Sequence, residues 1–124
     1  MGQEITRQPG TVLLVEDEES VRELVRTTLE RQGYTVLDTG QGDVAVQMAA
    51  SHAGRIDILI SDLVLPGIGG RELGLKVSES HPETKILFVS GYPEDMVAGP
   101  GIEFLQKPFT LQALAGKVHD VLGS

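Results

Sequence analysis

The sequence predicts an α/β fold, a single domain built on an open parallel sheet with helices on both faces. From Thr11 onward, short apolar runs rich in β-branched residues alternate with segments of helical period, which is typical of repeated strand–helix units. The first run, Val12 to Val15, has no polar alternation, as expected of a strand buried on both faces. A length of 124 residues fits one such domain.

Five strands are expected, and each is a short apolar run followed by a helical or connecting segment. They are residues 12–15, 34–37, 56–61, 85–89 and 102–105. The connection between the last two contains Pro93, Gly99, Pro100 and Gly101 and is near the minimum length of a parallel crossover. Of the five helices expected, the fourth is therefore predicted to be short or irregular.

The other four helices are predicted from their apolar spacing. The first is expected to bury Val21, Leu24, Val25, Thr28 and Leu29 and to stop at Gly33. The second, residues 41–52, is expected to bury Val44, Ala45, Met48 and Ala49. The third turns Leu73 and Val77 inward and is closed by Pro82. The last is capped by Thr110 and is expected to bury Leu111, Leu114, Ala115, Val118 and Leu122.

Composition limits the classes of function. A formal charge of -8 would repel a phosphate backbone, so direct binding to nucleic acid is not expected. Because no apolar run could span a bilayer, no secretory signal is visible and cysteine is absent, we expect a soluble cytoplasmic protein without membrane contact. Residues 1–10 are expected to form a flexible leader and residues 11–124 the domain. Proteins are the expected partners.

Polar residues stand at the carboxyl ends of four predicted strands. Open parallel sheets bind ligands at this edge, where the strand order reverses, so these side chains are expected to converge. They are Glu16 and Asp17 after the first strand, Asp62 after the third, Ser90 after the fourth, and Lys107 and Pro108 after the fifth.

These residue types suit phosphoryl transfer. Three crowded carboxylates would repel one another and raise at least one pKa unless a cation neutralised them, and Mg²⁺ is commonly held by one or two carboxylates plus phosphate oxygens. A carboxylate can also act as a nucleophile and form an aspartyl-phosphate. Asp62 is the best candidate, because it follows a buried strand and precedes the Pro-Gly loop at residues 66–70. A lysine and a hydroxyl supply further positioning and charge neutralisation.

Four segments resemble the receiver domains of response regulators in two-component signalling systems. They are residues 12–20 (VLLVEDEES), 58–70 (ILISDLVLPGIGG), 88–92 (FVSGY) and 103–109 (EFLQKPF), so the resemblance extends over nearly the whole chain from Thr11. It implies a flavodoxin-like sheet in the order 2-1-3-4-5. It also implies that Asp62 accepts a phosphoryl group from the phosphohistidine of a histidine kinase or histidine phosphotransfer domain, in cis or in trans.

The resemblance implies a role for each site residue. Asp17, Asp62 and the backbone carbonyl of Val64 would bind Mg²⁺, and Glu16 would act on the metal through water.

The remaining roles concern the phosphoryl group and the signal. Ser90 would hydrogen-bond the phosphoryl group, Lys107 would pair with it, and Pro108, preceded by a cis bond, would aim the lysine. Phe104 would turn inward when Ser90 moves, which makes these two residues the switch. A domain of this kind is not an enzyme in the usual sense, since it catalyses only its own phosphorylation and dephosphorylation.

Two kinds of parent protein are compatible with the sequence, a stand-alone regulator and a hybrid histidine kinase. Residues 90–92 and 106–110 favour the kinase. Receivers usually signal through the surface formed by their fourth helix, fifth strand and fifth helix. The short connection at residues 91–101 puts that surface in doubt, so the oligomeric state is left open.

Each site residue also has an ordinary structural explanation. Glu16 and Asp17 could stabilise a helix N-terminus, Asp62 and Ser90 could form turns, and Lys107 could be a solvated surface charge. Only their order at successive strand ends favours the functional interpretation.

Three rival functions share the architecture. An aspartyl-nucleophile phosphatase needs a second acid two residues after the nucleophile, where Val64 stands. A flavodoxin-like cofactor binder would place its phosphate against the acidic residues 16–19. The third alternative is a receiver-shaped interaction module that takes no phosphate.

Overall fold

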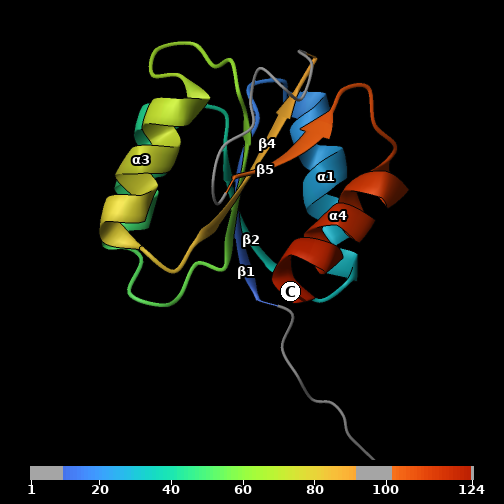
Figure 1. Ribbon diagram of the computed structural model, residues 1–124, viewed down its shortest axis with the longest axis horizontal. Helices are drawn as coiled ribbons and strands as arrows, with labels where there is room; N and C mark the ends of the chain where they lie inside the picture. The colour runs from blue at the N-terminus through green and yellow to red at the C-terminus, as the bar shows by residue number, and fades with distance from the viewer. Residues whose placement is uncertain (1–9, 92–101, 124) are drawn as a thin grey trace, which may run out of the picture.

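Five strands and four helices alternate along the part of the chain that the structure describes, residues 10–91 and 102–123 (Figure 1). The structure is a computed structural model. In chain order the elements are β1 (Thr11–Val15), α1 (Glu19–Arg31), β2 (Thr35–Thr39), α2 (Gly42–Ser51), β3 (Ile58–Asp62), α3 (Gly70–Ser80), β4 (Lys85–Ser90), β5 (Ile102–Gln106) and α4 (Leu111–Gly123). None of these helices is long and apolar enough to cross a bilayer. The predicted irregular helix between β4 and β5 and most of the predicted leader lie outside the described residues.

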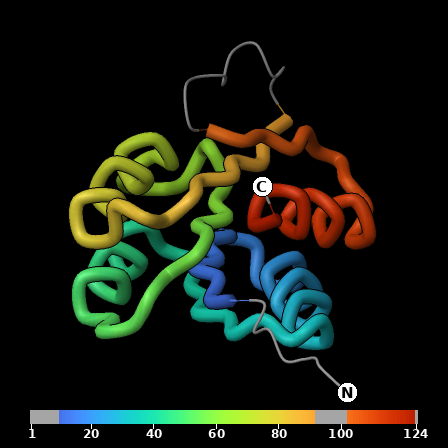
Figure 2. Tube along the Cα trace, turned by 60° about the horizontal axis from the view of Figure 1, so that its bottom comes forward, coloured from blue at the N-terminus to red at the C-terminus, as the bar shows by residue number. Residues whose placement is uncertain are grey.

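The strands form one parallel sheet in the order β2-β1-β3-β4-β5, which confirms the predicted topology. Helices α1 and α4 pack together on one face, and α2 and α3 cover the other (Figures 1 and 2). The chain runs outward from β1 to β2 and then returns to β3 on the other side of β1. The carboxyl ends of β1 and β3 therefore flank the point where the strand order reverses, which is where such sheets bind ligands.

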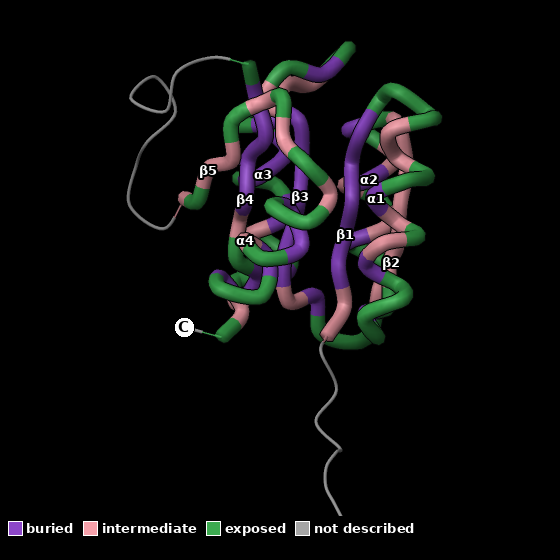
Figure 3. The backbone as a smooth tube through the Cα atoms, turned by 90° about the vertical axis from the view of Figure 1, so that its right-hand side faces the viewer, coloured by how far each residue is buried: buried purple, intermediate pink, exposed green. Residues whose placement is uncertain are grey.

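Two apolar cores lie on opposite faces of the sheet. Val12 and Leu14 of β1 face the core under α1 and α4, whereas Leu13 and Val15 face the core under α2 and α3. Strands β1, β3 and β4 are buried over most of their length, while β2 and β5 at the sheet edges are partly exposed (Figure 3). Burial on both faces explains why the central strands lack polar alternation.

Two predicted helix ends are confirmed. After α1, Gly33 has a φ of 99° and donates its N–H to the carbonyl of Glu30 at 3.0 Å, a left-handed conformation that favours glycine. Before α4, the hydroxyl of Thr110 accepts a hydrogen bond from the N–H of Ala113 at 2.9 Å, so it is the N-cap.

Two details of the sequence prediction are wrong. Leu24 is 57% exposed, because the buried stripe of α1 is narrower and passes through Val25 and Leu29. Strand β3 begins at Ile58 and continues to Asp62, which lies opposite Val89 of β4. The acid is thus the last residue of the strand, and the sheet itself fixes its backbone.

Leu59→Ala should lower the free energy of unfolding by about 2–5 kcal/mol, because Leu59 is fully buried in the core under α2 and α3. Urea denaturation measures this loss. Leu75→Ala is the matched control, since Leu75 of α3 is 70% exposed and its truncation should change stability by less than about 0.5 kcal/mol. Equal losses in the two variants would contradict this packing.

Candidate functional site

A pocket of about 300 Å³ opens at the carboxyl ends of the central strands. Asp17 is the second residue after β1, β3 ends in Asp62 and β4 ends in Ser90. The residues that line the pocket are Asp17, Asp62, Val64, Val89, Ser90, Gly91 and Lys107. The predicted convergence of these strand ends is therefore present in the structure.

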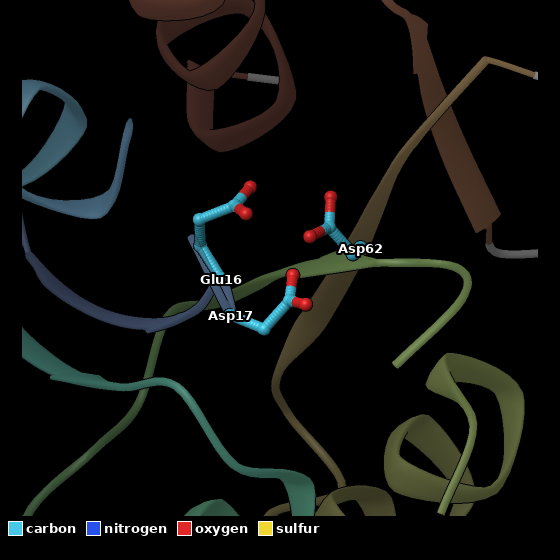
Figure 4. Close-up of side chains that lie close together, drawn as sticks. All are labelled: Glu16, Asp17 and Asp62. Atoms are coloured by element: carbon cyan, nitrogen blue, oxygen red, sulfur yellow. The ribbon is translucent and has the colours of Figure 1, made fainter. Parts of the chain in front are cut away.

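Three carboxylates dominate the site. Glu16, Asp17 and Asp62 each offer one oxygen, and these oxygens lie within 4.8 Å of one another. Figure 4 shows the three carboxyl groups turned toward one shared space. Glu16 and Asp62 are only 4% and 5% exposed, whereas Asp17 is exposed. Two of the three charges are thus held away from water, which is unfavourable without a compensating cation.

Lys107 supplies one compensating charge. Its Nζ lies 2.7 Å from Oδ1 of Asp62 and 3.6 Å from Oε1 of Glu16. The main chain beneath the lysine is fixed to β4, because the N–H of Lys107 donates to the carbonyl of Ser90 at 2.7 Å. The peptide bond between Lys107 and Pro108 is cis, as the resemblance implied.

The ammonium group leaves part of the negative charge unmatched. Oδ1 of Asp62 is buried and has no aligned hydrogen-bond partner within the described ranges, although Nζ of Lys107 is close to it. Three acids face a single ammonium group among the residues that approach the cluster most closely. A hard divalent cation, which prefers carboxylate oxygens, matches both the donor set and the excess charge.

Burial has the largest effect on the pKa of each shifted group in the site. Burial and, to a smaller extent, the charge of Asp62 raise the pKa of Glu16 to about 7. The N–H of Glu18, which donates to Oε2 of Glu16 at 3.0 Å, has the opposite effect. Burial also raises the pKa of Asp62, against the lowering effect of the contact with Lys107. Burial disfavours the charge of Lys107, yet the contacts with Asp62 and Glu16 raise its pKa overall.

Glycine at the start of α3 shapes the loop that follows Asp62. The N–H of Gly70 donates to the carbonyl of Leu63 at 2.9 Å, which brings the two ends of the loop together. A Cβ atom at Gly70 would collide with the carbonyl oxygen of Asp62. This close backbone approach requires glycine at position 70 and holds the end of β3 against the start of α3.

The predicted residues do not all belong to the pocket. Val64 lines it, but the ligand role of its carbonyl stays a prediction. Phe104 lies on β5 opposite Phe88 and is half-buried, outside the pocket lining.

Sequence reasoning missed Arg22, whose Nη1 donates to the carbonyl oxygen of Glu16 at 2.8 Å. Its spacing of four residues from Arg26 places both arginines on one face of α1, near Asp38 of β2. That spacing is the signal that could have identified it.

The fold and the site together define the class of this protein. Residues 12–119 match the response regulator receiver domain, and the chain belongs to this family of phosphoacceptor signalling domains of two-component systems. Membership in this family sets aside the phosphatase and cofactor-binding alternatives.

Receivers of hybrid kinases and free-standing receivers are both among the relatives. The sensor kinase CckA of Brucella abortus is 40% identical over 118 residues, which is 91% of this chain but 12% of that kinase. The receiver protein CpdR of the same species is 29% identical over 116 residues, covering 90% of this chain and 95% of CpdR. A crystal structure of the receiver domain of the hybrid histidine kinase CckA has a TM-score of 0.82 at 38% identity and covers 91% of this chain and 99% of that one. The chemotaxis regulator CheY4 of Vibrio cholerae has a TM-score of 0.79 at 30% identity, covering 91% of this chain and 98% of CheY4.

Glu16→Gln should stabilise the metal-free protein more at pH 8 than at pH 5.5. The pKa of Glu16 is about 7 in the folded protein against an unperturbed 4.5, so the folded state binds the proton more tightly and stability falls as pH rises from 4.5 through 7. Removing the charge should increase the advantage of the variant between pH 5.5 and 8 by roughly 1–2 kcal/mol. Urea denaturation in a chelator measures it.

Glu23→Gln makes the same charge change at an exposed position of α1 and serves as the control. Its stability relative to the wild type should stay constant over this range of pH. If the two variants showed the same pH dependence, burial of Glu16 would not be the cause.

Proposed function

We propose that Asp62 is the phosphoacceptor of this receiver and that it takes its phosphoryl group, in the cytoplasm, from the phosphohistidine of a histidine kinase or histidine phosphotransfer domain. The observation that carries this proposal is the position of Asp62. Its carboxyl group ends a buried strand, lines the open pocket, lies 2.7 Å from Lys107 and shares its surroundings with two further acids.

The transfer is a nucleophilic displacement at phosphorus. An oxygen of Asp62 attacks the phosphorus atom as the bond from phosphorus to the imidazole nitrogen of the donor breaks, and that nitrogen keeps the electron pair. The product is an acyl phosphate on Asp62. Because the sheet fixes the backbone of Asp62 through its pairing with β4, the carboxyl group approaches the donor without a large loss of conformational freedom.

Mg²⁺ fits the site as the resident metal. Its ligands would come from the carboxylates of Asp17 and Asp62 and the carbonyl of Val64, with Glu16 acting through water. The unmatched buried oxygen of Asp62 and the oxygen-only donor set support this assignment. When bound, the metal neutralises charge that develops on the transferred phosphoryl group.

Ser90 and Lys107, which line the same pocket, would bind the phosphoryl group. Lys107 pairs with Asp62 before transfer and is near enough to pair with the added phosphoryl oxygens afterwards. Ser90 ends β4, and its hydroxyl is the second group that the new oxygens attract. Phe104 on β5 is the proposed partner of Ser90 in the switch.

A second pocket gives the phosphodonor a place to bind. This groove, of about 520 Å³, is lined by Glu18, Val21, Leu24, Val25, Lys107, Pro108, Phe109 and Leu111. It is largely apolar and adjoins the acceptor pocket, because Lys107 lines both. A protein that lies in the groove is therefore beside Asp62, so we assign the groove to the protein that carries the phosphohistidine.

The parent that we propose is a hybrid histidine kinase, on the strength of the likeness to CckA. The domain itself would catalyse only its own phosphorylation and dephosphorylation.

Incubation with acetyl phosphate and Mg²⁺ should add one phosphoryl group to the wild-type chain and none to Asp62→Asn. Intact-mass analysis detects the adduct, and a chelator should prevent it. Asp43→Asn, which removes an exposed acid from α2, should still be phosphorylated. No adduct under any condition would favour a receiver-shaped interaction module that takes no phosphate.

Leu24→Gln should slow transfer from a phosphorylated histidine phosphotransfer protein while leaving phosphorylation by acetyl phosphate unchanged. The expected loss in kcat/KM is about fivefold, which corresponds to about 1 kcal/mol. Leu75→Gln, at the similarly exposed leucine on the opposite face of the sheet, is the control and should have no effect on either donor. An equal loss with both donors would show that Leu24 acts on the acceptor pocket instead of on docking.

A further inference from the structure

Arg22 connects three elements behind the acidic cluster. Its Nη1 donates to the main-chain oxygen of Glu16 at 2.8 Å, just after β1. Its Nε lies 3.2 Å from Oδ2 of Asp38 on β2, and the arginine itself belongs to α1. The side chain is largely shielded from solvent. One guanidinium group thus holds the end of β1 between a neighbouring strand and a helix.

The chain from Glu16 to Glu18 has further supports, and Arg22 completes them. The N–H of Glu16 donates to the carbonyl of Thr39 at 3.1 Å. The N–H of Glu18 donates to Oε2 of Glu16 at 3.0 Å. These bonds hold N–H groups on either side of the peptide link from Glu16 to Asp17, while Arg22 holds the carbonyl of that link. The direction of both acidic side chains follows from how this link is oriented.

The position of Arg22 has an electrostatic cost. It lies near the beginning of α1, and the positive end of the helix dipole disfavours cations there. Glu19 occupies the first turn, as expected of an acid, and Arg31 occupies the last, as expected of a base. Arg22 departs from that pattern, and its contacts with Asp38 and the carbonyl of Glu16 provide the compensation.

Gly40 leaves room for this contact. A Cβ atom at position 40 would lie 2.8 Å from Nη1 of Arg22 and 3.5 Å from the carbonyl oxygen of Glu16. The atom in the way is the far end of a flexible side chain, so a methyl group at position 40 would displace the guanidinium group while leaving the backbone in place.

We propose that Arg22 is a positioning residue of the acidic cluster, which orients Glu16 and Asp17 toward the metal without touching metal or phosphoryl group itself. The proposal rests on the proposed Mg²⁺ site. The other explanation is that Arg22 is only an ion pair between α1 and β2. Arg26 can distinguish the two explanations. It also pairs with Asp38, at 3.7 Å, but within the described residues it makes no hydrogen bond to Glu16.

The test compares Arg22→Gln with Arg26→Gln, which makes the same change of charge on the same helix face. Titration with Mg²⁺, followed by NMR amide shifts, should give a dissociation constant about tenfold higher in Arg22→Gln and nearly unchanged in Arg26→Gln. In the metal-free chain, exchange of the Glu16 amide with deuterium should be faster only in Arg22→Gln. Saturating Mg²⁺ should restore the rate of phosphorylation by acetyl phosphate.

Gly40→Ala provides a second variant that keeps Arg22. Like Arg22→Gln, it should raise the dissociation constant for Mg²⁺. If Arg22→Gln does not fold, Gly40→Ala tests the positioning role in its place. Equal dissociation constants and equal Glu16 exchange in the Arg22 and Arg26 variants would overturn the inference and leave the metal site intact. If the wild type itself bound no Mg²⁺, the proposed function would fail instead, and the exchange of the Glu16 amide would still test the positioning role.

Discussion

The repulsion among three carboxylates is the constraint on which the rest of this structure depends. Glu16, Asp17 and Asp62 hold oxygens within 4.8 Å of one another, and two of these side chains are buried. Isolated in water, such groups would separate. Here the acids follow or end two adjacent parallel strands, which fix the backbones of the three residues. The packing of the two apolar cores stabilises these strands and so holds the like charges together.

That constraint explains why several other residues contact the acids or fix the backbone beside them. Lys107 approaches from the segment after β5, and its own N–H is bonded to the end of β4. Gly70 lets α3 begin directly against the carbonyl of Asp62. The pKa of Glu16 and of Asp62 stays raised, mainly because both groups are buried, so these contacts do not fully offset the cost of burying the charges. An added divalent cation would remove the remaining excess of negative charge, which supports the proposed metal site.

The sequence was sufficient to predict the sheet, because strands that are buried on both faces have unbroken apolar runs, as β1 and β3 do. It also predicted the convergence of Asp62 with Lys107, since parallel strands place their carboxyl ends at one edge. It could not predict that Leu24 is exposed, because that depends on how closely the segment around Phe109 approaches α1. The contact of Arg22 with Glu16 could not be predicted either, since it needs the absence of a side chain at Gly40, which directly follows β2.

Among the described residues, the pocket around Asp62 and the apolar groove beside it share one lining residue, Lys107. The remaining residues of the groove, such as Leu24 and Phe109, have no place in the lining of the acceptor pocket. If the groove holds the phosphodonor, as we propose, these residues could change in a related receiver and select a new signalling partner while the chemistry at Asp62 stayed the same. Lys107 lines both pockets and could not change without altering the chemistry. Selectivity between related signalling pathways would therefore have to come from the other residues of the groove.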